Sequence, residues 1–172
     1  INNPWTQGMY FRLAQVVSFS NSFIENAADL AASNNEAAYF VAEARFLRAY
    51  AYLQLMDMYA NVPLVTKVTS ELPQQSNRQE IFSFVENELN EISSNLPDSR
   101  SNEYGRVDKV AAWALLSRLY LNASVYIGTD MSSQVISNAE KVISSSYSIN
   151  TSDGNGNGSA YDELFLADNN VN

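Results

Sequence analysis

The chain of 172 residues contains neither cysteine nor histidine. Without cysteine there is no disulfide and no thiolate nucleophile, and the redox compartment stays open because both kinds of compartment accept such a chain. Without histidine the commonest general base and metal ligand is missing. The sequence therefore predicts no metal site, no cofactor and no thiol or histidine chemistry.

Basic residues are also scarce, with 10 Lys and Arg against 19 Asp and Glu, which gives a net charge of −9. A nucleic-acid surface needs a basic footprint, so no nucleic-acid partner is expected, and the acidic surface serves solubility. No run reaches the ~18 apolar residues of a membrane helix. No charged-then-apolar signal peptide opens the chain.

What the chain has is apolar residues at helical spacing: it is 46% hydrophobic and 12% aromatic, as in a globular domain. The segment 42–65 is expected to form the central helix on which the rest of the chain packs. Apolar residues in this segment, together with Phe40 just before it, form two neighbouring stripes: Phe40, Ala44, Leu47, Ala51, Leu55 and Met58, and beside them Phe46, Tyr50 and Leu53. A helix that is apolar around so much of its girth packs on more than one side. It is expected to end near Ala60, because Pro63 cannot continue it.

Four further helices are predicted, over about 7–32, 77–96, 109–127 and 130–146. Asn2 or Asn3 ahead of Pro4 is a possible cap of the first, Ser76 and Gln79 fit a capping box for the third, and Asp108 can cap the fourth. The connection 61–76 is extended, and 147–172 is an irregular, Gly/Asn/Ser-rich segment. We therefore expect an all-α fold of antiparallel, tetratricopeptide-like helix pairs with irregular loops, forming a single helical-repeat domain over 1–172.

Two long blocks carry a family resemblance. The first is EARFLRAYAYL followed by NVPLV within 43–65, and the second is EYGRVDKVAAWALLSRLYLNASVYIG at 103–128. In this order and spacing they resemble the SusD/RagB-like outer-membrane nutrient-binding lipoproteins. Members of that family are normally much longer and begin with a signal whose cysteine carries the lipid anchor. The resemblance implies that this chain is the helical N-terminal part of such a protein, without the anchor.

The resemblance also implies a function. Such proteins capture an oligosaccharide at the surface of a Gram-negative outer membrane and pass it to a SusC-like TonB-dependent transporter, without chemical change. Because both blocks are close in sequence to those of starch-binding members, the resemblance implies starch or another α-glucan as the ligand. The alternative is a helical-repeat scaffold for protein contacts that has no glycan site of its own.

Trp5, with Asn2 and Asn3, is the candidate glycan site. Sugar rings present apolar C–H faces that stack on flat aromatic side chains, and flanking amides hydrogen-bond the hydroxyl groups. In starch-binding members of the family an aromatic arc, which includes a tryptophan near the start of this helical region, cradles the glucan. The competing interpretation is that Trp5 packs on the first helix.

Charged residues offer fewer functional candidates. Arg45 and Arg48 have no acidic residue three or four positions away, so we expect ion pairs with another helix, with Glu43 as a possible member. Arg106, after Gly105, precedes a helix N-terminus and can either hold an anion or simply pack. A glycosidase needs two carboxylates. The acidic residues of the third helix are expected on its polar, solvated side, and so to be non-catalytic: Glu86, Glu88 and Glu91.

Two other patterns have ordinary interpretations. The run Asp153 to Gly158 imitates the start of a calcium loop, but the glutamate required at position twelve falls on Leu164, with Glu163 one residue early. We interpret it as a connector. Several of the ten tyrosines lie at core-like helical spacing and are interpreted as packing residues: Tyr50, Tyr52, Tyr59 and Tyr120.

Overall fold

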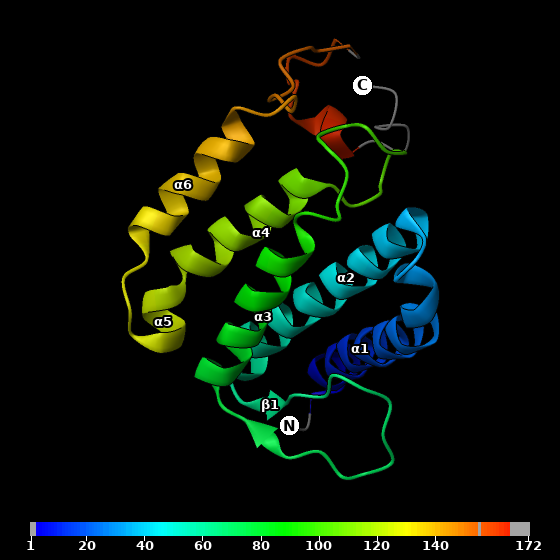
Figure 1. The fold of residues 1–172 in the computed structure, drawn as a ribbon. Coiled ribbons are helices and arrows are strands. Elements are labelled where there is room, and N and C mark those ends of the chain that lie inside the picture. Colours follow the sequence, from blue (N-terminus) through cyan, green and yellow to red (C-terminus); the bar gives the residue numbers. More distant parts are fainter. Residues whose placement is uncertain (1–2, 155, 166–172) are drawn as a thin grey trace.

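A computed structural model describes residues 3–154 and 156–165 of the chain. Over these residues the all-α prediction is confirmed (Figure 1). The helices are α1 (Pro4–Ala31), α2 (Asn35–Tyr59), α3 (Arg78–Ile92), α4 (Lys109–Leu121), α5 (Ala123–Ile127), α6 (Ser132–Ile143) and the 3-10 turn η1 (Asp162–Phe165). The extended connection contributes a two-stranded antiparallel sheet of β1 (Val62–Pro63) and β2 (Gln75–Ser76), in which Val62 pairs with Ser76.

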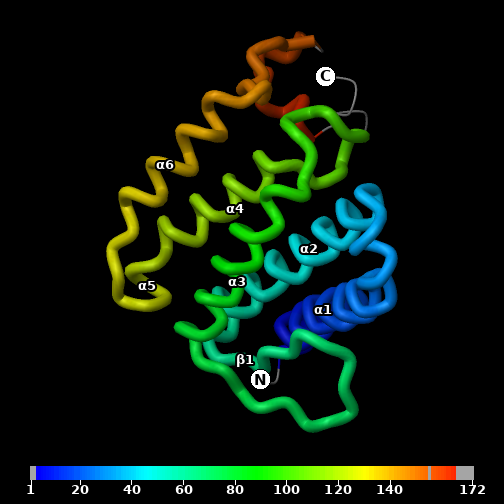
Figure 2. Tube along the Cα trace, viewed as in Figure 1, coloured from blue at the N-terminus to red at the C-terminus, as the bar shows by residue number. Residues whose placement is uncertain are grey.

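The long helices form one array in which neighbours run in opposite directions. Helix α1 packs on α2, α2 on α3, α3 on α4, and α4 on α6. Figure 2 shows α1 at one end of the array and α6 at the other, with the connection between β1 and β2 looping out beside the start of α1. This is the arrangement of stacked helix pairs that the sequence predicts.

Side chains at the helix starts explain why the helices begin where they do. The Asn3 side chain accepts hydrogen bonds from the Trp5 and Thr6 backbone N–H groups, and Asp108 accepts one from Ala111. The predicted box of Ser76 and Gln79 is wrong by one residue. The box is formed by Asn77 and Glu80, whose side chains each accept the other's backbone N–H at 3.0 Å.

Helix α2 packs on more than one side, as predicted, because it lies between α1 and α3. Its small residues Ala49 and Ala51 are fully buried, which lets both neighbours approach. Three residues of the two predicted stripes are nevertheless half-exposed: Leu47, Tyr50 and Met58. The largest side chains of the core come from α2, α3 and α4: Tyr52, Leu53, Met56, Ile81, Phe82, Leu89, Ile92, Leu116 and Leu119.

Some predicted boundaries are wrong. The helix expected over 109–127 breaks at Asn122, whose side-chain amide donates to the Arg118 carbonyl at 2.9 Å and whose backbone leaves the helical region. The third helix ends at Ile92, four residues before Leu96, because Asn95 closes a turn on the Ile92 carbonyl. In the described part of the chain, no helix has an apolar stretch long enough to cross a membrane.

Two glycines give opposite predictions for the same substitution. Gly128 ends α5 with a left-handed backbone, φ +70°, so Gly128→Ala is expected to lower the free energy of unfolding by about 1–2 kcal/mol. Gly8 lies inside α1, where an added Cβ meets no atom within 4 Å. Gly8→Ala is therefore expected to raise that free energy by about 0.5–1 kcal/mol. Urea unfolding of both variants checks the signs, and equal signs would contradict the assigned backbone conformations.

Candidate functional site

The N-terminal end of α1 carries the aromatic residue that the sequence analysis singled out. Trp5 is 86% exposed, so the competing interpretation, in which it packs on the first helix, is wrong. The Asn3 side-chain oxygen accepts the Trp5 backbone N–H at 2.9 Å and serves as the helix cap. Asn2 lies outside the described residues.

An open hollow of about 680 Å³ lies beside this helix end. Trp5 does not line it, but the next residues along the chain do. Its walls come from the start of α1, the end of α2 and the β1–β2 region: Thr6, Gln7, Tyr10, Phe11, Met58, Tyr59, Ala60, Asn61, Val62, Pro63, Gln75 and Arg78. Aromatic faces and side-chain amides thus converge on one surface.

Contacts between the two helices hold the walls of this hollow in place. The Tyr59 hydroxyl donates to the Thr6 carbonyl at 2.5 Å, and the Tyr59 ring meets Tyr10 edge to face at 5.3 Å between centroids. Gln75 donates from its amide to the Asn61 carbonyl at 3.0 Å. Phe11 is mostly exposed, and its ring meets that of Tyr10 edge to face at 6.2 Å between centroids. Sequence analysis missed Phe11, although its position off the apolar stripe of the first helix was a usable signal.

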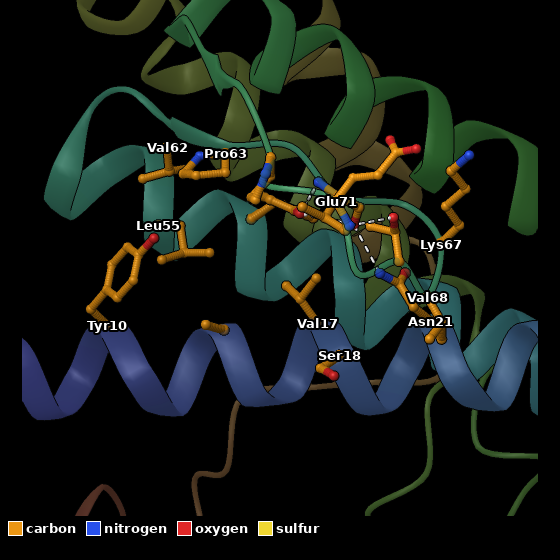
Figure 3. A pocket seen from close by; sticks show the side chains of 15 residues that line it. Tyr10, Val17, Ser18, Asn21, Leu55, Val62, Pro63, Lys67, Val68 and Glu71 are labelled. Atoms are coloured by element: carbon orange, nitrogen blue, oxygen red, sulfur yellow. Dashed lines mark hydrogen bonds between the residues drawn. The ribbon is translucent and has the colours of Figure 1, made fainter.

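A second, more enclosed cavity of about 310 Å³ lies between α1, α2 and the connection that follows β1 (Figure 3). Its walls are mostly apolar, with Val17 from α1, Leu55 from α2, Val62 and Pro63 from β1, and Val65 from the connection after β1, which we call the covering segment. Such a lining suits apolar groups better than sugar hydroxyls, which need polar partners.

The covering segment is fastened by side chains from both helices. The Tyr52 hydroxyl accepts the Val65 N–H at 2.7 Å and donates to the Val65 carbonyl at 3.0 Å. The Asn21 amide donates to the same carbonyl at 2.9 Å, and Arg48 donates to the Thr66 carbonyl at 3.1 Å. Burial raises the pKa of the Tyr52 hydroxyl, which keeps it protonated and able to donate.

Tyr52→Phe is therefore expected to lower the free energy of unfolding by about 1–3 kcal/mol, because the Val65 N–H loses its acceptor. Tyr50→Phe is the matched control on the same helix, since Tyr50 is half-exposed and its hydroxyl makes no hydrogen bond within residues 3–154 and 156–165. That change is expected to stay within about 0.5 kcal/mol. Equal effects in chemical denaturation would show that Tyr52 does not fasten the segment.

Arg45 and Arg48 pair with the third helix, as predicted. Arg48 donates to Glu88 at 2.7 Å, and Arg45 donates to Glu88 and to Glu91 at 2.6 Å each. The prediction that Glu88 is solvated is wrong, because Glu88 is only 7% exposed. The two arginines compensate its burial. With its oxygens engaged by arginines, Glu88 is a structural residue.

Arg106 belongs to a separate cluster, in which Glu43 is the anion. Glu43 accepts the Val107 N–H at 3.1 Å, the Tyr39 hydroxyl at 2.8 Å and a two-pronged pair with Arg106, whose guanidinium lies 5.0 Å from the Phe40 ring centre. Burial alone would raise the pKa of Glu43, but the hydrogen bonds from Arg106, Tyr39 and Val107 lower it overall. The chain's own carboxylate thus occupies the anion position considered for a ligand, and Glu43 is not part of the Arg45 and Arg48 network.

The calcium-like run folds on itself. Both carboxylate oxygens of Asp153 accept backbone N–H groups, from Asn157 at 3.1 Å and from Gly158 at 2.7 Å. Among the described residues, no group of three acidic, histidine or cysteine side chains is placed to hold a metal ion. The interpretation as a connector fits this geometry.

Comparison with known proteins places the chain among relatives with one fold. A SusD-like family model, described as starch-binding and associating with the outer membrane, matches residues 2–121. The starch-binding protein SusD of Bacteroides thetaiotaomicron is 35% identical over 167 residues, which is 97% of this chain and 28% of that protein. A SusD-like protein of Bacteroides ovatus is 34% identical over 88 residues, or 49% of this chain and 16% of that protein. The chain therefore spans less than a third of the length of these relatives.

Solved structures of SusD-like proteins show the same fold over most of this chain. A laminarin-binding SusD-like protein superposes with a TM-score of 0.69 at 27% identity, covering 78% of this chain and 29% of that one. A SusD-like protein from Bacteroides fragilis gives 0.70 at 27% identity, covering 85% and 28%. A structure with a xylogluco-oligosaccharide gives 0.71 at 26% identity, covering 81% of this chain and 29% of that one. With the family model covering most of the chain and a 35% identical relative covering nearly all of it, the chain belongs to the SusD-like family.

Proposed function

We propose that this chain contributes to capturing an oligosaccharide, in the first place starch or another α-glucan, and that Trp5 is the stacking platform. The observation that carries the proposal is the 86% exposure of Trp5 at the end of α1, in a member of a family described as starch-binding. A large aromatic ring left in water at such a place offers its face to a ligand. Capture of this kind needs no chemical change in the glycan.

The neighbouring hollow supplies the groups that a glycan needs beside a stacking ring. Gln7, Asn61 and Gln75 bring amides to its wall, and Phe11 brings a second exposed aromatic face. Amides hydrogen-bond sugar hydroxyls, and the aromatic faces accept the apolar sides of the rings. The relatives differ in their glycans, since their names mention starch, laminarin and a xylogluco-oligosaccharide. The α-glucan proposal rests on the relative with 35% identity.

We further propose that the protein works at the outer membrane, anchored by a lipid outside this sequence, and passes the glycan to a SusC-like TonB-dependent transporter. The family description supports the outer-membrane location. The transporter is a proposal from the resemblance of the two sequence blocks. Co-purification of a lipid-anchored, full-length parent with a SusC-like barrel from outer membranes tests it, and a parent that elutes without the barrel would contradict it.

The glycan proposal predicts that Trp5→Ala weakens binding by about tenfold to a hundredfold. Covering one large aromatic side chain contributes about 1.5–3 kcal/mol, and each 1.4 kcal/mol is a factor of ten in the dissociation constant. Native gels that contain starch, pullulan, inulin or xylan measure the retardation of the chain, of a full-length parent, and of the Trp5 variant of each. Retardation in starch and pullulan that the substitution removes is the expected result.

Tyr104→Ala is the control, because Tyr104 is also an exposed aromatic residue but belongs to the loop before α4. Figure 1 shows this loop at the opposite end of the helices from the start of α1, where Trp5 lies in the sequence. It is expected to leave retardation unchanged. If only the full-length parent is slowed, and Trp5→Ala does not change the retardation of that parent, this chain is a helical scaffold without a glycan site. If no gel slows either protein, the α-glucan is the wrong ligand.

A further inference from the structure

The cavity of about 310 Å³ between α1, α2 and the covering segment is not part of the proposed glycan site, although Tyr10, Val62 and Pro63 line both it and the hollow. Its deep wall is buried, with Val17 from α1, Leu55 from α2 and Val62 from β1. Figure 3 shows α1 along one side of the cavity and the covering segment along the other. The outer wall consists of exposed residues of that segment: Lys67, Val68, Thr69, Glu71 and Pro73. Close-packed interiors leave few voids larger than a water molecule, so a space of this size is a candidate binding site.

The covering segment is fastened to the helices through its first half. The backbone groups of Val65 are held by side chains of α1 and α2, and the Val68 N–H donates to Glu25 of α1 at 2.7 Å. Within the described residues, no hydrogen bond ties residues 69–73 to either helix, and the 3.1 Å bond from the Glu71 N–H stays inside the segment. Backbone with few such bonds opens at a low cost in free energy. Residues 69–73 are therefore the part of the wall that can move aside and admit a ligand.

The deep wall of the cavity offers few hydrogen bonds to water, because its polar groups are already used. The Tyr52 hydroxyl is engaged by the N–H and the carbonyl of Val65, and the Asn21 side chain donates to Val65 and accepts from Arg48 at 2.7 Å. A buried water needs about two to four polar partners, so this wall suits an apolar group. An apolar cavity of about 150 Å³ is large enough to hold benzene. This cavity, at about 310 Å³, has room for an aromatic ring with a substituent.

Two lining hydroxyls are available to a ligand, since those of Tyr10 and Ser18 make no hydrogen bond within residues 3–154 and 156–165. At the rim, Lys67 and Glu71 carry opposite charges, so the rim as a whole does not select a charged ligand. The rings of Tyr10 and Tyr52 in the wall favour an aromatic partner. We propose that the cavity binds a small, neutral aromatic molecule with one hydroxyl or N–H group, in the size range of phenol to indole. Binding of this molecule does not depend on glycan capture.

Fluorine NMR of para-fluorophenol, titrated with the 172-residue chain, tests the proposal. We expect one saturable site with a dissociation constant of about 0.1–1 mM, the affinity that burial of one small apolar ring supplies. Para-fluorobenzoate, an anion of similar shape, is expected to bind at least about tenfold more weakly, because burial removes water from its charge. Ala14→Phe fills the cavity and is expected to abolish binding. Ala28→Phe is the matched control, since Ala28 is an exposed alanine of the same helix that does not line the cavity.

Tyr10→Phe is a second variant, and it keeps the ring that packs on Tyr59. Loss of the hydroxyl is expected to weaken binding of para-fluorophenol by about two- to tenfold and to leave binding of para-fluorotoluene, which has no hydroxyl, unchanged. The absence of a saturable shift of para-fluorophenol up to about 10 mM would overturn the proposal. Binding that survives Ala14→Phe, in a chain whose circular dichroism is unchanged, would place the ligand elsewhere and also overturn it. Equal affinity for para-fluorobenzoate would show that the site does not select a neutral molecule, and the proposal would fail.

Discussion

Replacing Glu88 by alanine is expected to lower the free energy of unfolding by about 3–5 kcal/mol, because it leaves two arginines facing each other without their shared anion. The Arg48 side chain is nearly fully buried and cannot turn to water. Arg48 also donates to Asn21 of α1 at 2.7 Å and to the Thr66 carbonyl. Loss of Glu88 therefore disturbs α1, α2, α3 and the segment after β1 together, and urea unfolding followed by circular dichroism measures the cost.

Glu91→Ala is the matched control. Glu91 lies one turn further along α3 and pairs with Arg45 at the same 2.6 Å, but its side chain is 65% exposed. An exposed ion pair contributes about 0–1 kcal/mol, so this variant is expected to lose no more than that. If both variants lose the same amount, water reaches Glu88 and the network is an ordinary surface pair. If Glu88→Gln retains most of the stability, hydrogen bonding rather than charge holds Arg48.

The same network shows what the sequence could predict. Two arginines on one helix without nearby acidic residues correctly indicated partners from another helix. The partner was misplaced, because the glutamates of α3 were all assigned to its polar side. Glu88 fits the helical spacing of the buried positions 81, 85 and 92 as well as Leu89 does, and both residues are buried. Periodicity of apolar residues alone cannot show a buried charge, since the charge is stabilised by residues 40 and 43 positions away.

The candidate site was predictable only in part. Asn3 as a helix cap follows from local chemistry, and so does an aromatic residue at a helix start. The exposure of Trp5 does not, because it depends on which helices lie beside α1. The hollow is less predictable still. It needs the end of α2 next to the start of α1, and it needs the pairing of β1 with β2, which brings Gln75 to Asn61. Those contacts join segments far apart in the sequence.

The second large effect is expected at the junction between α3 and α4. Phe82 of α3 is buried, and its ring lies 6.4 Å from that of Tyr120 of α4. Phe82→Ala is expected to lower the free energy of unfolding by about 3–5 kcal/mol, as the loss of apolar contact adds to the cost of the cavity. Phe19→Ala is the matched control in α1, where the ring is mostly exposed, and it is expected to change stability by less than about 0.5 kcal/mol.

The position of Phe82 also predicts where the structure loosens. Helices α4 and α6 pack closely on each other. The contacts that join this pair to α1, α2 and α3 are made mainly by α4 with α3, and the short helix α5 also contacts α3. Removing the ring at this junction should therefore speed amide hydrogen exchange in α4 and α6 more than in α1 and α2, whose mutual contact does not involve Phe82. Uniform acceleration across all the helices would show instead that the array unfolds only as one unit. In that case the α3–α4 junction is no weaker than the pairing of α1 with α2, and stability is shared along the whole stack of helices rather than divided between its two ends.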